Sequence, residues 1–331
     1  MSETRPPPLV LIIGSGRSGT SWIGRIFDSL DSVLYLHEPD LVIYDPEFPV
    51  VPDPDRFETL LPHADALLDR LAAARPLKAV ASRPIFRKSW RRPAAHHLRV
   101  LLIYGLRLAE EVLGNRVQRI PIPDMIDKSA RGPQTTVIKS VTGLARLSYF
   151  ATVRPDMPIL HVMRHPCGMV ASLLRGIAKG KMPRPHVYDR QLALPPARRR
   201  GLDRKAIDRM SDLELSATLW TIMHEWALER CPEGARVLNV RYDDLCADPL
   251  HEAQKMLSFC GLPFDSGVEA FIRSGLEAPT GGKNAYHSVI RNPAIAANKW
   301  REELSPAQIE RIHEIVGDSV PGRLFAREGS P

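Results

Sequence analysis

Residues 9–22 read LVLIIGSGRSGTSW. The first five residues of this stretch, Leu9 to Ile13, are apolar and run into a glycine-rich segment. A short apolar run ended by glycines predicts a buried strand that enters a tight turn. Apolar residues then recur at helical spacing, at Ile23, Ile26, Phe27 and Leu30. Strand, glycine loop and helix together aim backbone N–H groups and a helix N-terminus at an anion, so the stretch predicts a phosphate-binding loop.

The loop does not match the nucleotide-triphosphatase pattern GxxxxGK[ST]. Gly14 and Gly19 have its spacing, but Thr20 stands at the lysine position and the positive charge is on Arg17. The GxGxxG pattern of dinucleotide-binding folds fits formally, and it requires an acidic residue about 20 positions further on. Glu38 lies close to that position, so spacing leaves the dinucleotide interpretation open. A glycine turn that binds nothing is disfavoured, because glycines, an arginine and hydroxyls coincide at a strand–helix junction.

The composition is that of an ordinary globular chain, since 44% of the 331 residues are hydrophobic and 25% are charged. The length allows one large α/β domain or two small ones. No apolar run approaches the roughly 18–20 residues of a membrane span, and the N-terminal MSETRPPP lacks the layout of a signal peptide. Four widely spaced cysteines fit neither a disulfide framework nor a CxxC metal site: Cys167, Cys231, Cys246 and Cys260. We therefore expect a cytoplasmic location.

The net charge of +7 favours an anionic partner without naming it. Nucleic acid, an acidic membrane and a multiply charged nucleotide all qualify, but no motif for nucleic-acid binding supports the first. One basic stretch, residues 83–92, also contains Phe86 and Trp90. This pattern is typical of a solvated surface, and the alternative is a wall of a site for an acidic or sugar-like substrate.

Further short apolar runs predict strands at residues 32–37, 135–141, 158–163 and 236–240. Helical patterns cover residues 64–74, 96–114, 143–152, 168–178, 211–229 and 249–260, and capping boxes begin at Ser211 and Ser305. Because strands alternate with helices, we predict an α/β domain with a central parallel sheet flanked by helices on both faces. Loops are predicted where prolines cluster, at residues 46–62, in an Arg-rich and mobile insert at 180–205, and at 275–298.

Glu38 follows the second predicted strand and precedes Pro39. Proline disfavours helical geometry in the residue before it, so we expect an extended backbone at Glu38. The carboxyl ends of strands line the ligand crevice in open α/β sheets, which places Glu38 beside the phosphate-binding loop.

The loop resembles the RSGT[ST] segment of sulfotransferases that use 3′-phosphoadenosine 5′-phosphosulfate (PAPS), at Arg17, Ser18, Gly19, Thr20 and Ser21. In that family the segment holds the 5′-phosphosulfate. A second match is Arg164, at a predicted strand end, with Ser172 eight positions later in the following helix. In the family this pair binds the 3′-phosphate, and a guanidinium suits that task because it forms two parallel hydrogen bonds to a phosphate.

Weaker matches agree with the resemblance. The segment RYDDL resembles a strand-end segment of the family whose tyrosine, here Tyr242, lies near the 3′-phosphate. Lys299 begins a KW segment whose lysine reaches the cofactor in the family, and Lys139 stands where related enzymes carry a basic residue. Ser288 and Arg291 are further candidates in the loop before the KW segment.

The resemblance implies sulfuryl transfer from PAPS to a hydroxyl of a carbohydrate, glycolipid or other small molecule, with PAP as product and no metal. Arg17 and Lys139 are expected to offset charge on the bridging and leaving oxygens. Glu38 is expected to be the general base, since related enzymes place a glutamate at this point. Histidines serve as the base in other relatives, so three remain alternatives: His37, His161 and His165.

From this resemblance we expect residues 1–331 to form one sulfotransferase domain with five parts. These are 5–40 with the phosphosulfate loop and base, 41–135 as a variable acceptor-side insertion, 136–175 with the 3′-phosphate unit, 176–210 as a basic mobile insert, and 211–331 with the C-terminal helices and KW segment.

Two other functions stay open. A P-loop kinase or nucleotide hydrolase needs a magnesium carboxylate, for which Asp243 is the candidate, and a non-catalytic nucleotide-binding protein needs only the loop. The sequence does not indicate an oligomeric state.

Overall fold

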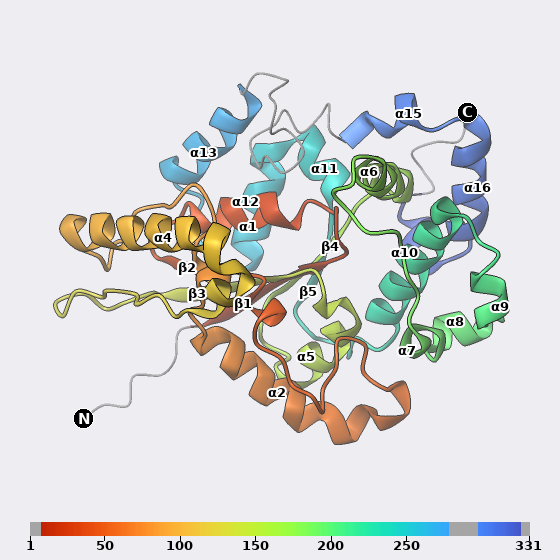
Figure 1. Ribbon diagram of the computed structural model, residues 1–331, viewed down its shortest axis with the longest axis horizontal. Helices are drawn as coiled ribbons and strands as arrows, with labels where there is room; N and C mark the ends of the chain where they lie inside the picture. The colour runs from red at the N-terminus through yellow and green to blue at the C-terminus, as the bar shows by residue number, and fades with distance from the viewer. Residues whose placement is uncertain (1–7, 278–296, 326–331) are drawn as a thin grey trace.

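A computed structural model describes residues 8–277 and 297–325 of the chain. Its centre is a five-stranded sheet in the order β2-β3-β1-β4-β5, and every neighbouring pair is parallel (Figure 1). The strands are β1 (Leu9–Gly14), β2 (Val33–His37), β3 (Thr135–Ser140), β4 (Ile159–Met163) and β5 (Val237–Arg241). All five agree with the predicted runs to within a residue or two, and the predicted parallel α/β architecture is confirmed.

Helices and short 3-10 turns make up most of the rest of the described chain. The first half contains α1 (Thr20–Asp28), η1 (Pro39–Leu41), η2 (Pro54–Arg56), α2 (Phe57–Ala73), α3 (Leu77–Val80), α4 (Pro93–Leu113), η3 (Gly114–Arg119), η4 (Gly143–Arg146) and α5 (Leu147–Val153). The second half contains α6 (Pro166–Ala178), α7 (Asp189–Leu192), α8 (Pro195–Arg199), α9 (Arg204–Ile207), α10 (Asp212–Glu229), α11 (Tyr242–Ala247), α12 (Pro249–Phe259), α13 (Ser266–Leu276), α15 (Trp300–Glu303), α16 (Pro306–Val316) and α17 (Val320–Arg323). Both predicted capping boxes are present, at the starts of α10 and α16. Within the described ranges, no helix combines the length and apolarity that a membrane crossing requires.

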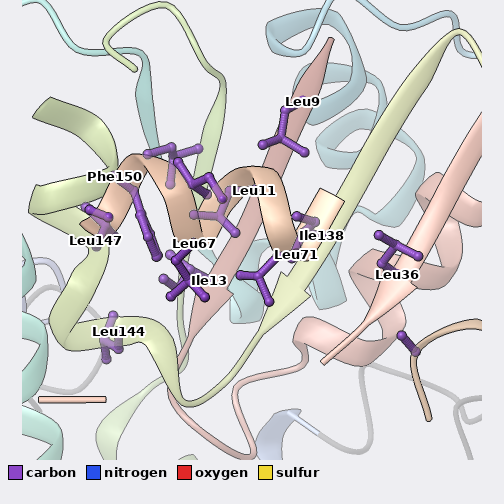
Figure 2. Close-up of a cluster of buried hydrophobic side chains, with 14 of the residues drawn as sticks. Leu9, Leu11, Ile13, Leu36, Leu67, Leu71, Ile138, Leu144, Leu147 and Phe150 are labelled. Carbon is purple, nitrogen blue, oxygen red and sulfur yellow. The ribbon is translucent and has the colours of Figure 1, made fainter. Parts of the chain in front are cut away.

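The sheet is covered on both faces, which explains why β1 is apolar at consecutive positions instead of alternating. Leu9, Leu11 and Ile13 point into one hydrophobic cluster with residues of α2 and α5. Figure 2 shows Leu11 and Ile13 of this cluster beside Leu67 and Phe150. Val10 and Ile12 point the other way, into a second cluster built with α1, α12 and α13. Figure 1 shows α2 and α5 on one side of the sheet and α1 and α12 on the other.

Two loop predictions are wrong. Helix α2 begins at Phe57 and includes Pro62, which lacks one backbone hydrogen bond, and the buried Leu60, Leu67 and Leu71 pack the helix against the core. The Arg-rich insert forms three short helices, α7 to α9, because Val187, Leu194 and Ala197 are buried within it. Arg200 also pairs with Glu225 of α10 at 2.5 Å, so charged residues that suggested a solvated loop anchor the insert instead. Most of the predicted loop 275–298 lies outside the described residues.

The basic stretch 83–92 divides into exposed and buried members. Arg83, Arg87 and Arg92 are exposed, as a solvated surface requires. Lys88 is only 7% exposed, and its Nζ donates to the carbonyls of Asp28 at 2.6 Å and Leu30 at 2.8 Å. Lys88 therefore satisfies carbonyls at the C-terminus of α1, where a cation is favoured, and ties the insertion to the phosphate-loop helix.

Replacing Lys88 with methionine should lower the free energy of unfolding by about 2–3 kcal/mol, because the carbonyl groups of Asp28 and Leu30 and the Asp28 carboxylate, 2.9 Å away, each lose a charged donor. Urea unfolding curves of the two proteins measure this difference. Arg92→Ala is the control, because Arg92 makes its ion pair with Asp127 at the surface. Equal stability of the Lys88 variant and wild type would show that Lys88 has no structural role.

Candidate active site

The predicted site residues lie along one edge of the sheet. Because all five strands run in the same direction, their carboxyl ends meet at this edge, where ligands bind in open α/β sheets. In sheet order the edge carries Glu38 after β2, Lys139 near the end of β3, the glycine loop after β1, Arg164 after β4 and Tyr242 after β5. Every strand thus contributes a predicted residue, from segments that are far apart in the sequence.

The glycine loop joins β1 to α1 through two residues in the left-handed region, Arg17 with φ 70° and Gly19 with φ 88°. Its shape is braced internally, since the hydroxyl of buried Ser18 donates to the Ser15 carbonyl at 2.6 Å. Thr20 begins α1 and is also buried, whereas Ser21 is partly exposed. Among the described residues, no atom lies within 4 Å of a Cβ built on Gly16, so the loop is open on that side. The strand, loop and helix thus have the geometry from which the sequence analysis predicts an anion-binding site.

Tyr242 packs directly against the loop. A Cβ built on Gly19 would lie 2.0 Å from Cδ2 of the Tyr242 ring, so this position requires glycine for space as well as for backbone conformation. The Arg164 guanidinium carbon lies 5.3 Å from the centroid of the same ring, an arrangement that favours a cation. Burial raises the pKa of Tyr242 far above its usual range, so the ring is a neutral platform that fixes both the loop and Arg164.

Arg17 and the predicted 3′-phosphate pair are in contact. Arg17 Nε donates to Ser172 Oγ at 3.1 Å, and Arg164 Nη1 donates to the Arg17 carbonyl at 3.2 Å. Arg164 and Ser172 are 7% and 1% exposed. Gly168 permits the close packing, because a Cβ there would lie 2.9 Å from Arg164 Nε. The structure therefore joins the residues predicted for the two anionic groups into one cluster with two guanidinium groups.

The prediction of an extended backbone at Glu38 is wrong. Glu38 has φ 52° and ψ 51°, in the left-handed region, and the 3-10 turn η1 starts at Pro39. Proline excludes the right-handed helical conformation at the preceding residue, and the chain turns through the left-handed one while the Glu38 N–H bonds the Lys139 carbonyl at 2.8 Å. Such a conformation at a non-glycine residue is strained by about 1–3 kcal/mol.

Two lysines hold the Glu38 carboxylate. Lys139 Nζ donates to Oε1 at 2.5 Å, and Lys78 Nζ donates to Oε2 at 3.2 Å. Burial raises the pKa of Glu38, but the charge of Lys139 and the further effects of His37 and Lys78 outweigh it and lower the pKa to about 2. Glu38 is therefore ionised throughout the neutral range, while Lys139 is only 1% exposed.

Lys78 is the site residue that the sequence analysis missed. It comes from the short helix α3, inside the insertion for which no motif was recognised, and reaches Glu38 because α3 packs against β2. The only signal for Lys78 in the sequence is that a lysine stands within the short apolar segment that forms α3.

Each of the three histidines proposed as alternative bases is already in contact with another side chain. Burial and the charge of Lys139 lower the pKa of His37 to about 3, and its Nδ1 lies 2.9 Å from the Tyr35 hydroxyl. His165 stacks on Trp300 with ring centroids 4.6 Å apart, and burial lowers its pKa to about 3. His161 is fully buried within the sheet, where burial lowers its pKa to about 4.

Four predicted residues remain: Lys299, Ser288, Arg291 and the candidate magnesium ligand Asp243. Lys299 is half exposed, and its Nζ lies 3.5 Å from Glu303. Ser288 and Arg291 lie outside the described residues. Asp243 accepts the backbone N–H of His165 at 2.7 Å, and within the described ranges no three His, Cys, Asp or Glu side chains form a group suited to a metal ion.

A cleft of about 510 Å³ lies between the insertion at residues 41–135 and the insert at residues 176–210. Its lining is mostly charged and comes from both of them, including Asp53, Asp55 and Arg56 on one side and Asp189, Arg190 and Arg198 on the other. The cleft is therefore bounded on one side by the predicted acceptor-side insertion, residues 41–135, and on the other by the basic insert, residues 176–210.

Comparisons with known proteins identify relatives over most of the chain. A model described as the sulfotransferase family matches residues 8–266. Mouse carbohydrate sulfotransferase 1 is 26% identical over an alignment that covers 89% of this chain and 74% of the mouse protein. Human carbohydrate sulfotransferase 2 is 23% identical, with 98% of this chain and 66% of the human protein covered. Among solved structures, the sulfotransferase domain of the Synechococcus PCC 7002 olefin synthase is 17% identical with a TM-score of 0.46, covering 99% of this chain and 98% of that one.

Proposed function

The chain belongs to the sulfotransferase family, and we propose that it moves a sulfuryl group from PAPS to a hydroxyl of a carbohydrate acceptor, as a free saccharide or a glycolipid. The observation that carries this proposal is the row of side chains along the sheet edge, with an ionised carboxylate at one end and two guanidiniums around the glycine loop at the other. Relatives named carbohydrate sulfotransferases support the acceptor class.

The donor set suits a nucleotide with phosphate groups at two positions. The open side of the loop at Gly16 and the N-terminus of α1 offer a place for the 5′-phosphosulfate. Arg164 and Ser172 offer a guanidinium and a hydroxyl to the 3′-phosphate. Arg17 lies between the two groups, since its backbone contacts Arg164 and its side chain contacts Ser172. These side chains are positive or neutral, as PAPS requires.

In the proposed reaction, the acceptor hydroxyl gives its proton to the Glu38 carboxylate while its oxygen bonds to sulfur. The bond between sulfur and the bridging oxygen breaks, and its electron pair leaves with the 5′-phosphate of PAP. Arg17 and Lys139 would stabilise the charge that builds on these oxygens, with about 3–4 kcal/mol at stake for a key donor. A carboxylate that accepts hydrogen bonds from two lysines is a weak base. We therefore infer that the bonds from Lys139 and Lys78 to Glu38 weaken when the two lysines interact with the negative charge of the bound donor.

Incubation with PAPS and a panel of saccharide and glycolipid acceptors tests the proposal, with mass spectrometry to detect the gain of one sulfate. Transfer to a sugar hydroxyl is the expected result. Hydrolysis of ATP without PAP binding would favour a kinase or hydrolase. Tight PAP binding without transfer to any acceptor would favour a non-catalytic nucleotide-binding protein.

Two glycine variants separate the folding of the loop from its use as a binding site. Gly19→Ala should lower both the melting temperature and PAP affinity, the latter at least about 10-fold, because the new methyl group meets the Tyr242 ring and the backbone has φ 88°. Gly16→Ala should keep the wild-type melting temperature but weaken PAP binding, since its methyl group enters the open side of the loop. Thermal melts and calorimetric titration measure both quantities. Unchanged PAP affinity in Gly16→Ala would place the donor elsewhere.

The acceptor and the location of the enzyme are proposed on separate grounds. The cleft between the two inserts is the proposed acceptor-side surface, because its carboxylates and guanidiniums can hydrogen-bond sugar hydroxyls. The four cysteines are free thiols, and this suits the cytoplasmic location that we propose.

A further inference from the structure

A line of hydrogen-bonded side chains runs behind the glycine loop. Asn239 Oδ1 lies 2.9 Å from His161 Nδ1, and His161 Nε2 lies 2.8 Å from His224 Nδ1. His224 Nε2 then lies 3.2 Å from the hydroxyl of Ser15, inside the loop. The sheet register explains the first contact, because His161 of β4 pairs directly with Asn239 of β5. Helix α10 supplies His224, so three elements converge on Ser15.

All three hydrogen bonds in this line are donated in the same direction, from Ser15 toward Asn239. The Asn239 carbonyl oxygen can only accept, so the proton of neutral His161 is on Nδ1. His161 Nε2 must then accept from His224 Nδ1, and His224 Nε2 must accept from the Ser15 hydroxyl. Both histidines are 0% exposed, and burial lowers the pKa of each, to about 4 for His161. Both rings are therefore neutral near pH 7, as this pattern of donors and acceptors requires.

Ser15 is also the residue that closes the loop. Its carbonyl accepts from the Ser18 hydroxyl at 2.6 Å and from the Ser18 N–H at 3.4 Å. The Ser15 hydroxyl is held by His224. The loop is thus fixed from within by Ser18 and from behind by the histidines. An anion site gains affinity when its donors are held in place before the ligand arrives.

We propose that His224, oriented by His161 and Asn239, is a positioning residue that holds the glycine loop in its anion-binding shape through the Ser15 hydroxyl. The ligand class rests on the proposed function, but the positioning role does not require it. His224 acts only through Ser15, so the two residues should behave as one unit when they are substituted.

A double-mutant cycle with PAP as the probe tests this role. His224→Phe keeps a buried ring but removes the acceptor nitrogen, and Ser15→Ala removes the donor. Each should weaken PAP binding about 5- to 10-fold, as the loss of one hydrogen bond predicts. The double variant should be no weaker than the weaker single one. His224→Gln can place an amide group near Ser15 and should bind PAP almost as wild type does. Effects that multiply in the double variant would overturn the proposal.

Two measurements without ligand complete the test. Hydrogen exchange of residues 15–19 should accelerate equally in His224→Phe and Ser15→Ala, and nitrogen NMR should show both imidazoles protonated on Nδ1. Lys88→Met is the matched control, because it should destabilise the fold without accelerating exchange in the loop. A lower melting temperature in His224→Phe with wild-type exchange and PAP affinity would reduce the histidine to a structural role. If wild type fails to bind PAP, the proposed function fails, and the exchange data alone decide the positioning role.

Discussion

Glu38→Gln should lower turnover at least about 100-fold while leaving PAP binding nearly intact. Glutamine has the size of glutamate and keeps an oxygen for Lys139 and a second polar group near Lys78, but it cannot take the proton of an acceptor hydroxyl. Binding should persist because the arginines around the glycine loop are unchanged. Single-turnover rates at saturating PAPS and calorimetric titration with PAP measure the two quantities separately.

Stability supplies an independent check on Glu38. Its pKa is lowered to about 2 from the 4.5 that is usual for a glutamate, so its ionised form stabilises the folded state. This contribution is complete above pH 4.5 and disappears as the pH falls toward about 2. The melting temperatures of wild type and Glu38→Gln should therefore differ at neutral pH and converge across this window. Turnover equal to wild type in the variant would remove Glu38 as the base, whatever its effect on stability.

Arg17→Ala should weaken PAP binding and lower the turnover rate together, each by about 100-fold, because one side chain serves both the bound donor and the charge that develops during transfer. Arg17 is the cation of the loop, and it also contacts the predicted 3′-phosphate serine, Ser172. Its loss therefore removes a contact between the two segments that are proposed to bind the anionic groups, as well as a charge. Titration with PAP and steady-state kinetics with a fixed acceptor measure these effects.

A second substitution separates charge from geometry at this position. Arg17→Lys keeps the positive charge but loses the planar group that can make two parallel hydrogen bonds, so it should recover only part of the affinity. Arg92→Ala, which changes an exposed arginine paired with Asp127, controls for the general loss of positive charge. Turnover at the wild-type rate in Arg17→Ala, at saturating PAPS, would confine Arg17 to binding.

Local signals in the sequence predicted most of the framework of the site. The apolar run of β1 and the glycines after it predicted the loop, and the helical pattern at residues 168–178 predicted the helix after Arg164, which begins at Pro166. Local rules failed at Glu38, where proline limits the backbone but cannot select between the extended and left-handed conformations. The 3-10 turn that starts at Pro39, together with the backbone bond to Lys139, decides between them.

The amino-acid sequence was sufficient to predict the five strands, most of the longer helices, the parallel sheet and the position of the glycine loop, because these depend on apolar periodicity, glycines and caps within a few neighbouring residues. Only the tertiary structure decided which side chains meet. Arg17 contacts Ser172 from 155 positions away, Glu38 contacts Lys78 from 40, and Ser15 contacts His224 from 209. Such contacts arise when separate elements pack on a common sheet, and no local pattern encodes which of many lysines or histidines will be brought to its edge.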